Sequence, residues 1–244
     1  MTPAALFLAL MIGLSMGVLG GGGSIIAVPA LTFLLHFPPK EAVVTSLAIV
    51  GAVAASGAVT AIARGAMPLP LAAVVAVAAT AGAYPGGLAG AHLADRAQLL
   101  LLGVIMLMAA VVLWRTSAGQ QTSPPRNNLL LLIVLGVSVG AITGLVGVGG
   151  GFLMVPALVI GARQPMQQAA ATSLLVIALA AFAAIPGYAG RVTLDWSFIA
   201  PFVAVGACGV AAGGVVAQFL PQRRLQQAFA AVLVVLASYV LTQA

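Results

Sequence analysis

Two glycine-rich interruptions of apolar segments hold the groups of this chain that are best suited to bind a ligand. They run from Gly20 to Ser24 and from Gly147 to Gly151. Glycine permits a tight turn and a close approach of a ligand to the backbone. The half-helix after each break would offer free N–H groups and the positive end of its dipole. The predicted anion-binding residues are Gly20, Gly22, Gly23, Ser24, Gly147, Gly149, Gly150 and Gly151.

Close helix packing is the alternative explanation of these glycines, because small residues let membrane helices approach one another. The repetition of the pattern argues for more than packing. Each break is followed by Val-Pro-Ala-Leu, and the prolines of the two copies, Pro29 and Pro156, stand 127 residues apart. Irregular backbone persists in a bilayer only where protein covers it or where it lines a cavity. We therefore favour a binding site at the breaks and a structural role for the two prolines.

Two further side-chain pairs recur in the same register and could complete an anion site. Thr45-Ser46 and Thr172-Ser173 place hydroxyl donors without charge in the spans that follow the half-helices. The alternative for these hydroxyls is a hydrogen bond to the preceding helical turn. Arg64 and Arg191 end long spans. They could hold an oxyanion in a bidentate contact, or they could extend to the interface as topological anchors.

The scarcity of titratable groups argues against catalysis and proton pumping. The carboxylates are Glu41, Asp95 and Asp195, all near predicted loops, so a buried proton relay is poorly supported. The two histidines lie near span ends and are not spaced with other ligands for a metal. Ser24 lacks an evident base that would make it a nucleophile. The sequence predicts no catalytic residue, no cofactor, no metal site and no enzymatic activity.

The composition is that of a polytopic membrane protein. Hydrophobic residues make up 63% of the 244 residues, charged residues 5%, and the mean hydropathy is +1.22. About a quarter of an ordinary soluble chain is charged, so no soluble fold could hide these side chains. The net charge of +6 comes from cations scattered between apolar runs, which does not suggest nucleic-acid binding. The expected partners are a small anion and the lipid bilayer, and a homodimer is left open.

The elements that must position these groups form two similar halves. We expect a first repeat over 1–115, a polar linker over 116–128 and a second repeat over 129–244. Glycine, proline, Thr-Ser and arginine positions match at a constant offset of 127, including Gly13 with Gly140 and Arg64 with Arg191. Internal duplication is common in transporters. The expected spans are 4–19, 24–37, 41–63, 69–92 and 97–114, then 128–146, 151–162, 167–189, 196–219 and 225–242.

Loop cations predict the orientation of the two halves. If the glycine breaks are hairpin turns, each half crosses the membrane an odd number of times and the halves are inverted. Six loop cations, among them Arg64 and Arg163, then share one side, against three on the other. If residues 4–37 formed one broken crossing, the division would be five against four. The positive-inside rule favours inverted halves, with the linker in the cytoplasm and both termini outside.

The two Gly-rich breaks, each followed by Val-Pro-Ala-Leu and then by Thr-Ser-Leu, resemble the TauE/SafE family of sulfite and organosulfonate exporters. The similarity runs from about Gly13 to Tyr239. It implies a multi-pass transporter of the bacterial inner membrane that exports small sulfur-containing anions and performs no catalysis. An importer or channel for other anions such as sulfate or carboxylates, or a non-transporting membrane scaffold, are the alternatives. We expect one anion site where the two breaks meet near the midplane.

Overall fold

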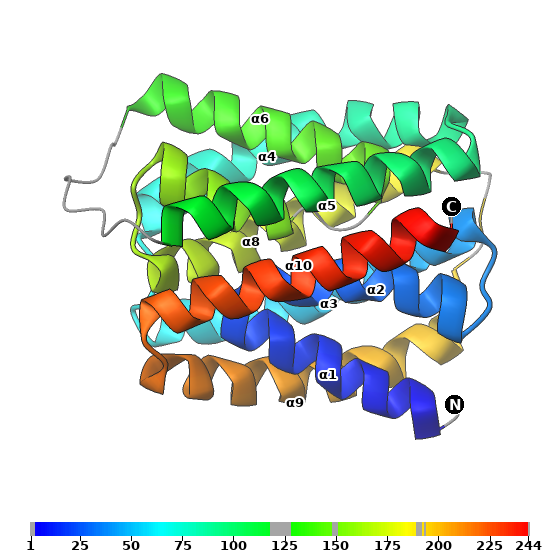
Figure 1. Cartoon of the computed structure of the whole chain (residues 1–244), viewed down its shortest axis with the longest axis horizontal. Coiled ribbons are helices and arrows are strands. Elements are labelled where there is room, and N and C mark those ends of the chain that lie inside the picture. The colour runs from blue at the N-terminus through cyan, green and yellow to red at the C-terminus, as the bar shows by residue number, and fades with distance from the viewer. Residues whose placement is uncertain (1–2, 118–127, 148–150, 189–191, 193, 244) are drawn as a thin grey trace.

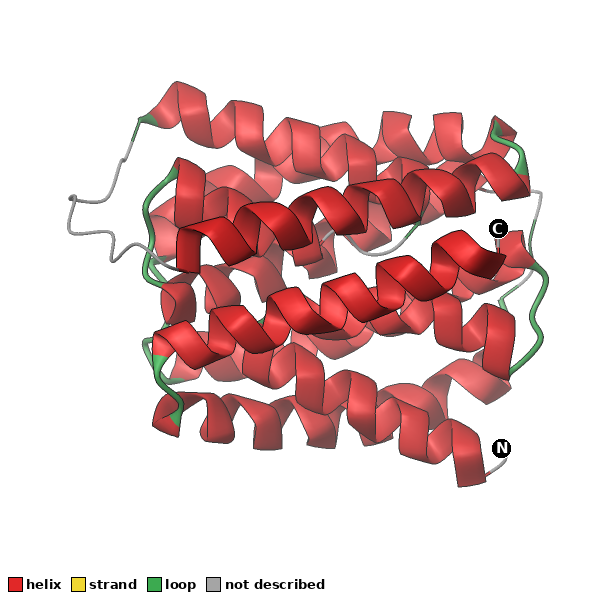
Figure 2. Ribbon diagram, in the orientation of Figure 1, coloured by secondary structure: helices red, strands yellow, loops and turns green. Residues whose placement is uncertain are grey.

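The computed structural model describes residues 3–117, 128–147, 151–188, 192 and 194–243, and its regular structure there is entirely helical (Figure 2). The first half contains α1 (Pro3–Leu19), α2 (Gly22–Pro29), the π-helical turn η1 (Ala30–Leu34), α3 (Pro39–Ala63), α4 (Leu69–His92) and α5 (Asp95–Ser117). The second half contains α6 (Leu129–Val146), α7 (Gly151–Pro156), the π-helical turn η2 (Ala157–Gly161), α8 (Met166–Ala184), the 3₁₀ turn η3 (Ile185–Tyr188), α9 (Trp196–Val216), the 3₁₀ turn η4 (Ala217–Phe219) and α10 (Gln222–Gln243).

The expected fold class, a polytopic bundle of membrane helices, is confirmed. Six of the described helices are long and apolar enough to cross a bilayer, a crossing that takes about 20 residues. α1 and the α2–η1 segment are shorter apolar helices, as expected for pieces on either side of a break. Most helix ends fall within three residues of the predicted spans.

Local chemistry explains where the helices begin. The side chain of Asn128 accepts hydrogen bonds from the backbone N–H groups of Leu130 and Leu131, which caps α6. Asp195 caps α9 in the same way by accepting from the N–H of Ser197. The hydroxyl of Ser197 also donates to this carboxyl, and that hydrogen bond lowers the pKa of Asp195. Prolines 38 and 165 precede α3 and α8, where a missing N–H costs nothing.

The first glycine break forms a hairpin turn, and the second break starts with the same backbone conformation. Gly20 and Gly147 have φ of +73° and +74°, a left-handed conformation that residues with a Cβ rarely adopt. α2 then runs back along α1, so close that a methyl group on Gly23 would collide with the Ile12 carbonyl. Pro29 and Pro156 end the α-helical part of each second segment, and a π-turn follows.

The chain begins and ends at one face of the bundle. Figure 1 shows the start of α1 and the end of α10 at this face, which we call the terminal face. The end of α5 and the start of α6 lie at the opposite face, which we call the linker face. Each half therefore enters at one face and leaves at the other, as hairpin turns at the breaks require. The symmetry axis that would relate the halves stays a prediction.

The two halves interleave, and α3 and α8 lie at the centre. α1 of the first half packs on α9, and α6 of the second half packs on α4. Burial is greatest for α3 and α8 among the described spans. These two helices run antiparallel, with Gly57 facing Leu174 and Gly51 facing Ala181. The Thr-Ser pairs on α3 and α8 therefore sit inside the bundle and away from lipid.

The arrangement of faces leads to a topology experiment. We expect a cysteine at Ser117, at the end of α5, and a cysteine at Gln243, at the end of α10, to lie on opposite sides of the membrane. The background should be Cys208→Ser, because the native cysteine is exposed. With an impermeant maleimide, Gln243→Cys should react in intact spheroplasts and Ser117→Cys only after permeabilisation. Reaction of both from the same side would contradict the inverted arrangement.

Candidate functional site

Each glycine break is covered by the serine of the Thr-Ser pair in the opposite half and by the residue three positions before it. A methyl group on Gly20 would lie 2.6 Å from the Ser173 hydroxyl oxygen and 2.6 Å from the Ala170 Cα, both on α8. A methyl group on Gly147 would collide with the Val43 side chain on α3. The Ser46 hydroxyl, one turn further along α3, lies 2.8 Å from the Gly147 carbonyl oxygen. The two motifs recognised in the sequence thus meet in space, but across the halves.

The expectation that the two breaks meet near the midplane is corrected by this arrangement. Because Gly57 faces Leu174, Ser173 lies opposite about residue 58 of α3, some twelve residues from Ser46. At a rise of 1.5 Å per residue, the two breaks are roughly 18 Å apart along the bundle. The end of α1, just before Gly20, lies toward the linker face, and the end of α6, just before Gly147, lies toward the terminal face (Figure 1). Each break is covered by a different helix of the central pair, which holds them apart.

Most hydroxyls of the predicted site are buried and already bonded to backbone. Ser24 donates to the Gly21 carbonyl at 2.7 Å, and Ser173 donates to the Ala170 carbonyl at 2.7 Å. Ser46 shares its proton between the Val43 and Gly147 carbonyls, both at 2.8 Å. Thr45 is 3% exposed, and the buried Thr172 hydroxyl has no hydrogen-bond partner among the described residues. These contacts stabilise the breaks, and ligand contact by the hydroxyls stays a prediction.

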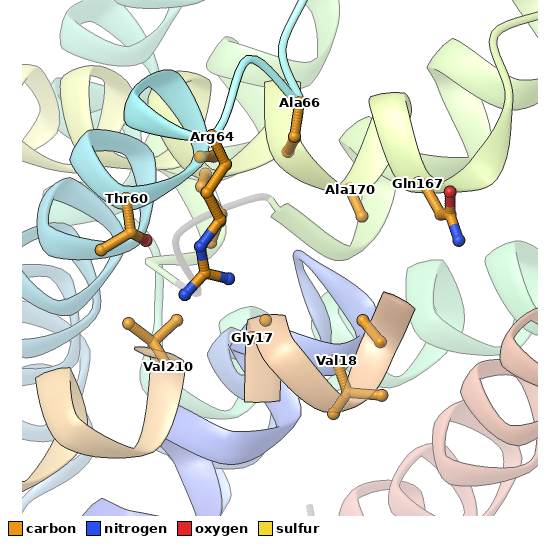
Figure 3. Close-up of a pocket in the computed structure, with 13 residues that line it drawn as sticks. Gly17, Val18, Thr60, Arg64, Ala66, Gln167, Ala170 and Val210 are labelled. Carbon is orange, nitrogen blue, oxygen red and sulfur yellow. The ribbon is translucent and has the colours of Figure 1, made fainter. Parts of the chain in front are cut away.

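A pocket of about 120 Å³ lies beside the first break, between the ends of α1 and α3 and the start of α8. Its wall is mostly small and apolar, and its polar side chains are those of Thr60, Arg64 and Gln167. Figure 3 shows the Arg64 guanidinium reaching from the end of α3 toward Gly17 and Val210. Ala170, which covers Gly20, also lines the pocket, so the pocket and the break adjoin the same turn of α8.

Arg64 supplies the positive charge of this pocket. A methyl group on Gly214 of α9 would lie 3.2 Å from Nη1 of Arg64, so the glycine leaves room for the guanidinium. Within the described part of the chain, no carboxylate lies within ion-pair distance of Arg64. The Thr60 hydroxyl donates to the Gly57 carbonyl, which leaves Arg64 and Gln167 as the side-chain donors that face the cavity. The arrangement suits an anion of few atoms.

The start of α2 adds backbone donors at the first break. Its N-cap is Gly21, and no side chain caps the helix. The first N–H groups of a helix have no partner within the helix, so those of Gly22, Gly23 and Ser24 are not used by α2 itself. α2 has eight residues and α7 only six. The first break is therefore the better candidate for an anion site. Of the residues predicted in the second half, Gly151 begins α7, and Gly149, Gly150 and Arg191 lie outside the described residues.

Sequence reasoning missed the part of the pocket formed by α8 and α9. Gly214 approaches Arg64, and Gln167 joins the wall of the same pocket, only because the halves interleave. One signal was available. Gly214 corresponds to Gly87 at the offset of 127, and glycine at both positions indicates that a side chain is excluded there.

Comparison with known proteins extends over nearly the whole chain. The profile of a protein family described as Sulfite exporter TauE/SafE matches residues 5–240. Two curated relatives, each named Probable membrane transporter protein, come from Xylella fastidiosa strains 9a5c and Temecula1 / ATCC 700964. Each is 29% identical to this chain over 238 residues, which covers 95% of this chain and 91% of the relative. No solved structure matches the chain.

Proposed function

Because the chain belongs to the TauE/SafE sulfite exporter family, we propose that this membrane transporter exports small sulfur-containing anions across the bacterial inner membrane. Sulfite and small organosulfonates are the proposed cargo. They would enter the Arg64 pocket from the linker face and bind at the start of α2.

The observation that carries this proposal is the Arg64 guanidinium, which has no carboxylate partner among the described residues and lines a small pocket beside the first break. A guanidinium can donate two parallel hydrogen bonds to the oxygens of one oxyanion, and such charged bonds are stronger than neutral ones. The pocket, at about 120 Å³, is well below the roughly 300–1,000 Å³ of pockets that hold drug-sized ligands. A compact sulfur oxyanion matches both its charge and its size.

The position of the pocket supports outward transport. The pocket adjoins the α3–α4 loop at the linker face, which the distribution of loop cations assigns to the cytoplasm. An exporter must load its cargo from that side. Alternating access would then carry the anion past the central helices α3 and α8 to the terminal face.

The test is the substitution Arg64→Gln, which keeps hydrogen-bond donors and removes the charge. We expect the affinity for sulfite to fall about tenfold or more, the effect of losing one hydrogen bond to a charged group. Titration calorimetry of the detergent-purified protein measures the affinity. Efflux of labelled sulfite from proteoliposomes should fall with it.

The matched control is Arg163→Gln, which removes a cation of the α7–α8 loop at the same face but outside the pocket. It should leave sulfite affinity unchanged. Glucose and spermidine serve as neutral and cationic solutes that should not bind. Equal affinities in Arg64→Gln and the parent protein would remove Arg64 from the site, and preference for glucose or spermidine would contradict anion binding.

A further inference from the structure

The internal duplication assigns a counterpart to every residue of the Arg64 pocket, and the largest difference in side-chain size between the two sets falls at one position. Gly17, Arg64 and Gly214 correspond to the identical residues Gly144, Arg191 and Gly87 at the offset of 127. Ala61, which lines the pocket, corresponds to Tyr188. A small residue in one half is thus replaced by an aromatic residue in the other.

Tyr188 fills the space that corresponds to the pocket. It is 1% exposed, and its hydroxyl donates to the Gly144 carbonyl at 2.7 Å and approaches the Leu145 carbonyl at 3.4 Å. These two residues correspond to Gly17 and Val18, which line the open pocket. A methyl group on Gly90 would collide with the same hydroxyl. The ring therefore lies between α4 and α6, beside the end of α6 that leads into the second break.

Gln98, at the start of α5, holds Tyr188 in this position. Its side-chain amide nitrogen donates to the Leu145 carbonyl at 2.8 Å and to the Tyr188 hydroxyl at 3.2 Å. Gln98 is 3% exposed, and its carbonyl oxygen is buried without a hydrogen-bond partner among the described residues. The second half has Leu225 at the corresponding position. Burying an amide that lacks one of its hydrogen bonds costs free energy. This cost lowers the stability of the closed arrangement relative to one in which Gln98 and Tyr188 separate.

A second contact closes the bundle at the terminal face, again at a position that corresponds to a residue of the open pocket. Lys40 corresponds to Gln167, a wall residue of the open pocket. Its ammonium group donates to the Ala91 and Leu93 carbonyls at 2.8 and 2.7 Å, at the end of α4, and lies 3.9 Å from the Asp95 carboxylate. The start of α3 is thereby tied to the end of α4.

We infer that Tyr188 is the gate at the terminal-face end of the anion path, held closed by Gln98. This inference rests on the proposed transport function. The open Arg64 pocket and the filled Tyr188 position then represent one state of the alternating cycle, with the linker face open and the terminal face closed. Tyr188 ends the 3₁₀ turn η3, which contains Pro186, whereas the corresponding residues 58–61 belong to the α-helix α3. A 3₁₀ stretch of this kind often marks a hinge.

The first test measures access to Val43, which corresponds to the pocket residue Ala170. In a Cys208→Ser background, Val43→Cys should react slowly with a sulfonate-bearing methanethiosulfonate reagent, since Val43 is 2% exposed. Adding Tyr188→Phe, which removes the hydroxyl and keeps the ring, should raise the reaction rate about tenfold, the effect of one net hydrogen bond. Tyr188→Ala should raise it further. The melting temperature of each variant shows whether it is folded.

The mirror substitution Ala61→Tyr tests the same inference on the open side. It should fill the Arg64 pocket, slow the modification of Ala170→Cys about tenfold and weaken sulfite binding. An unchanged rate at Val43→Cys in folded Tyr188→Phe or Tyr188→Ala would overturn the gate. If the rates change as expected but no sulfur anion is transported, the gate stands and the proposed cargo is wrong.

Discussion

Replacing Gly140 by alanine should push α6 away from α4 and strongly destabilise the bundle. The added methyl group would collide with the Ala79 carbonyl, which is backbone and cannot rotate aside. Overpacking of this kind costs about 1–3 kcal/mol and occasionally more. Alanine recovers about 1 kcal/mol through its higher helix propensity. The collision is with backbone, so we expect a cost at the upper end of this range and a net loss of about 1–2 kcal/mol, seen as a lower midpoint of thermal unfolding in detergent. Gly13→Ala should behave alike, because its methyl group would meet the Gly206 carbonyl of α9.

Gly51→Ala is the matched control for these packing substitutions. Gly51 lies in the middle of α3, where a methyl group would be 3.2 Å from the Ala181 Cβ and 3.5 Å from the Phe182 ring. A shift of a few tenths of an ångström accommodates it, so helix propensity should leave this variant as stable as the parent or more so. Suppose that Gly13→Ala and Gly140→Ala unfold at the same midpoint temperature as Gly51→Ala. Close contact between α1 and α9 and between α4 and α6 would then not limit stability.

Gly22→Ala should have the opposite effect. The variant should lose affinity for sulfite and keep the thermal stability of the parent protein. Gly22 is the first residue of α2, and it is not among the described glycines with positive φ, so alanine fits the backbone. A methyl group there would stand where the anion approaches the free N–H groups. We expect an affinity loss of about tenfold or more, corresponding to one charge-assisted hydrogen bond. Titration calorimetry and a thermal melt of the same preparation separate affinity from stability.

Gly23→Ala is the neighbouring control. Its methyl group would collide with the Ile12 carbonyl and the Met16 side chain, so it should loosen the α1–α2 hairpin and lower the melting midpoint. If Gly22→Ala and Gly23→Ala both have lower melting midpoints and their folded fractions bind sulfite normally, the first break has a structural role only. The anion site would then have to lie elsewhere. The corresponding comparison at Gly149 falls outside the described residues.

The sequence by itself determined the helices and the breaks, and it predicts the repeat. A helix in lipid must satisfy its own backbone groups, so long apolar runs such as 69–92 specify their structure locally. Gly20 and Gly147 were identifiable as turns because a left-handed residue within an apolar run favours glycine. Matched positions at one offset predict the duplication from the sequence alone. The family resemblance rested on these same local motifs and was confirmed by the match over residues 5–240.

Only the tertiary structure decided which parts of the two halves meet. Local periodicity carries no information about the partner of a helix, so the contacts of Ser46 with Gly147 and of Ser173 with Gly20 could not be predicted. The antiparallel packing of α3 on α8 then keeps the breaks apart, which overturned the single midplane site. Because of the same packing, residues that correspond in the two halves have different surroundings. Ala61 leaves a pocket open beside Arg64, whereas Tyr188 fills the corresponding space, because a side chain's role depends on the neighbours that surround it.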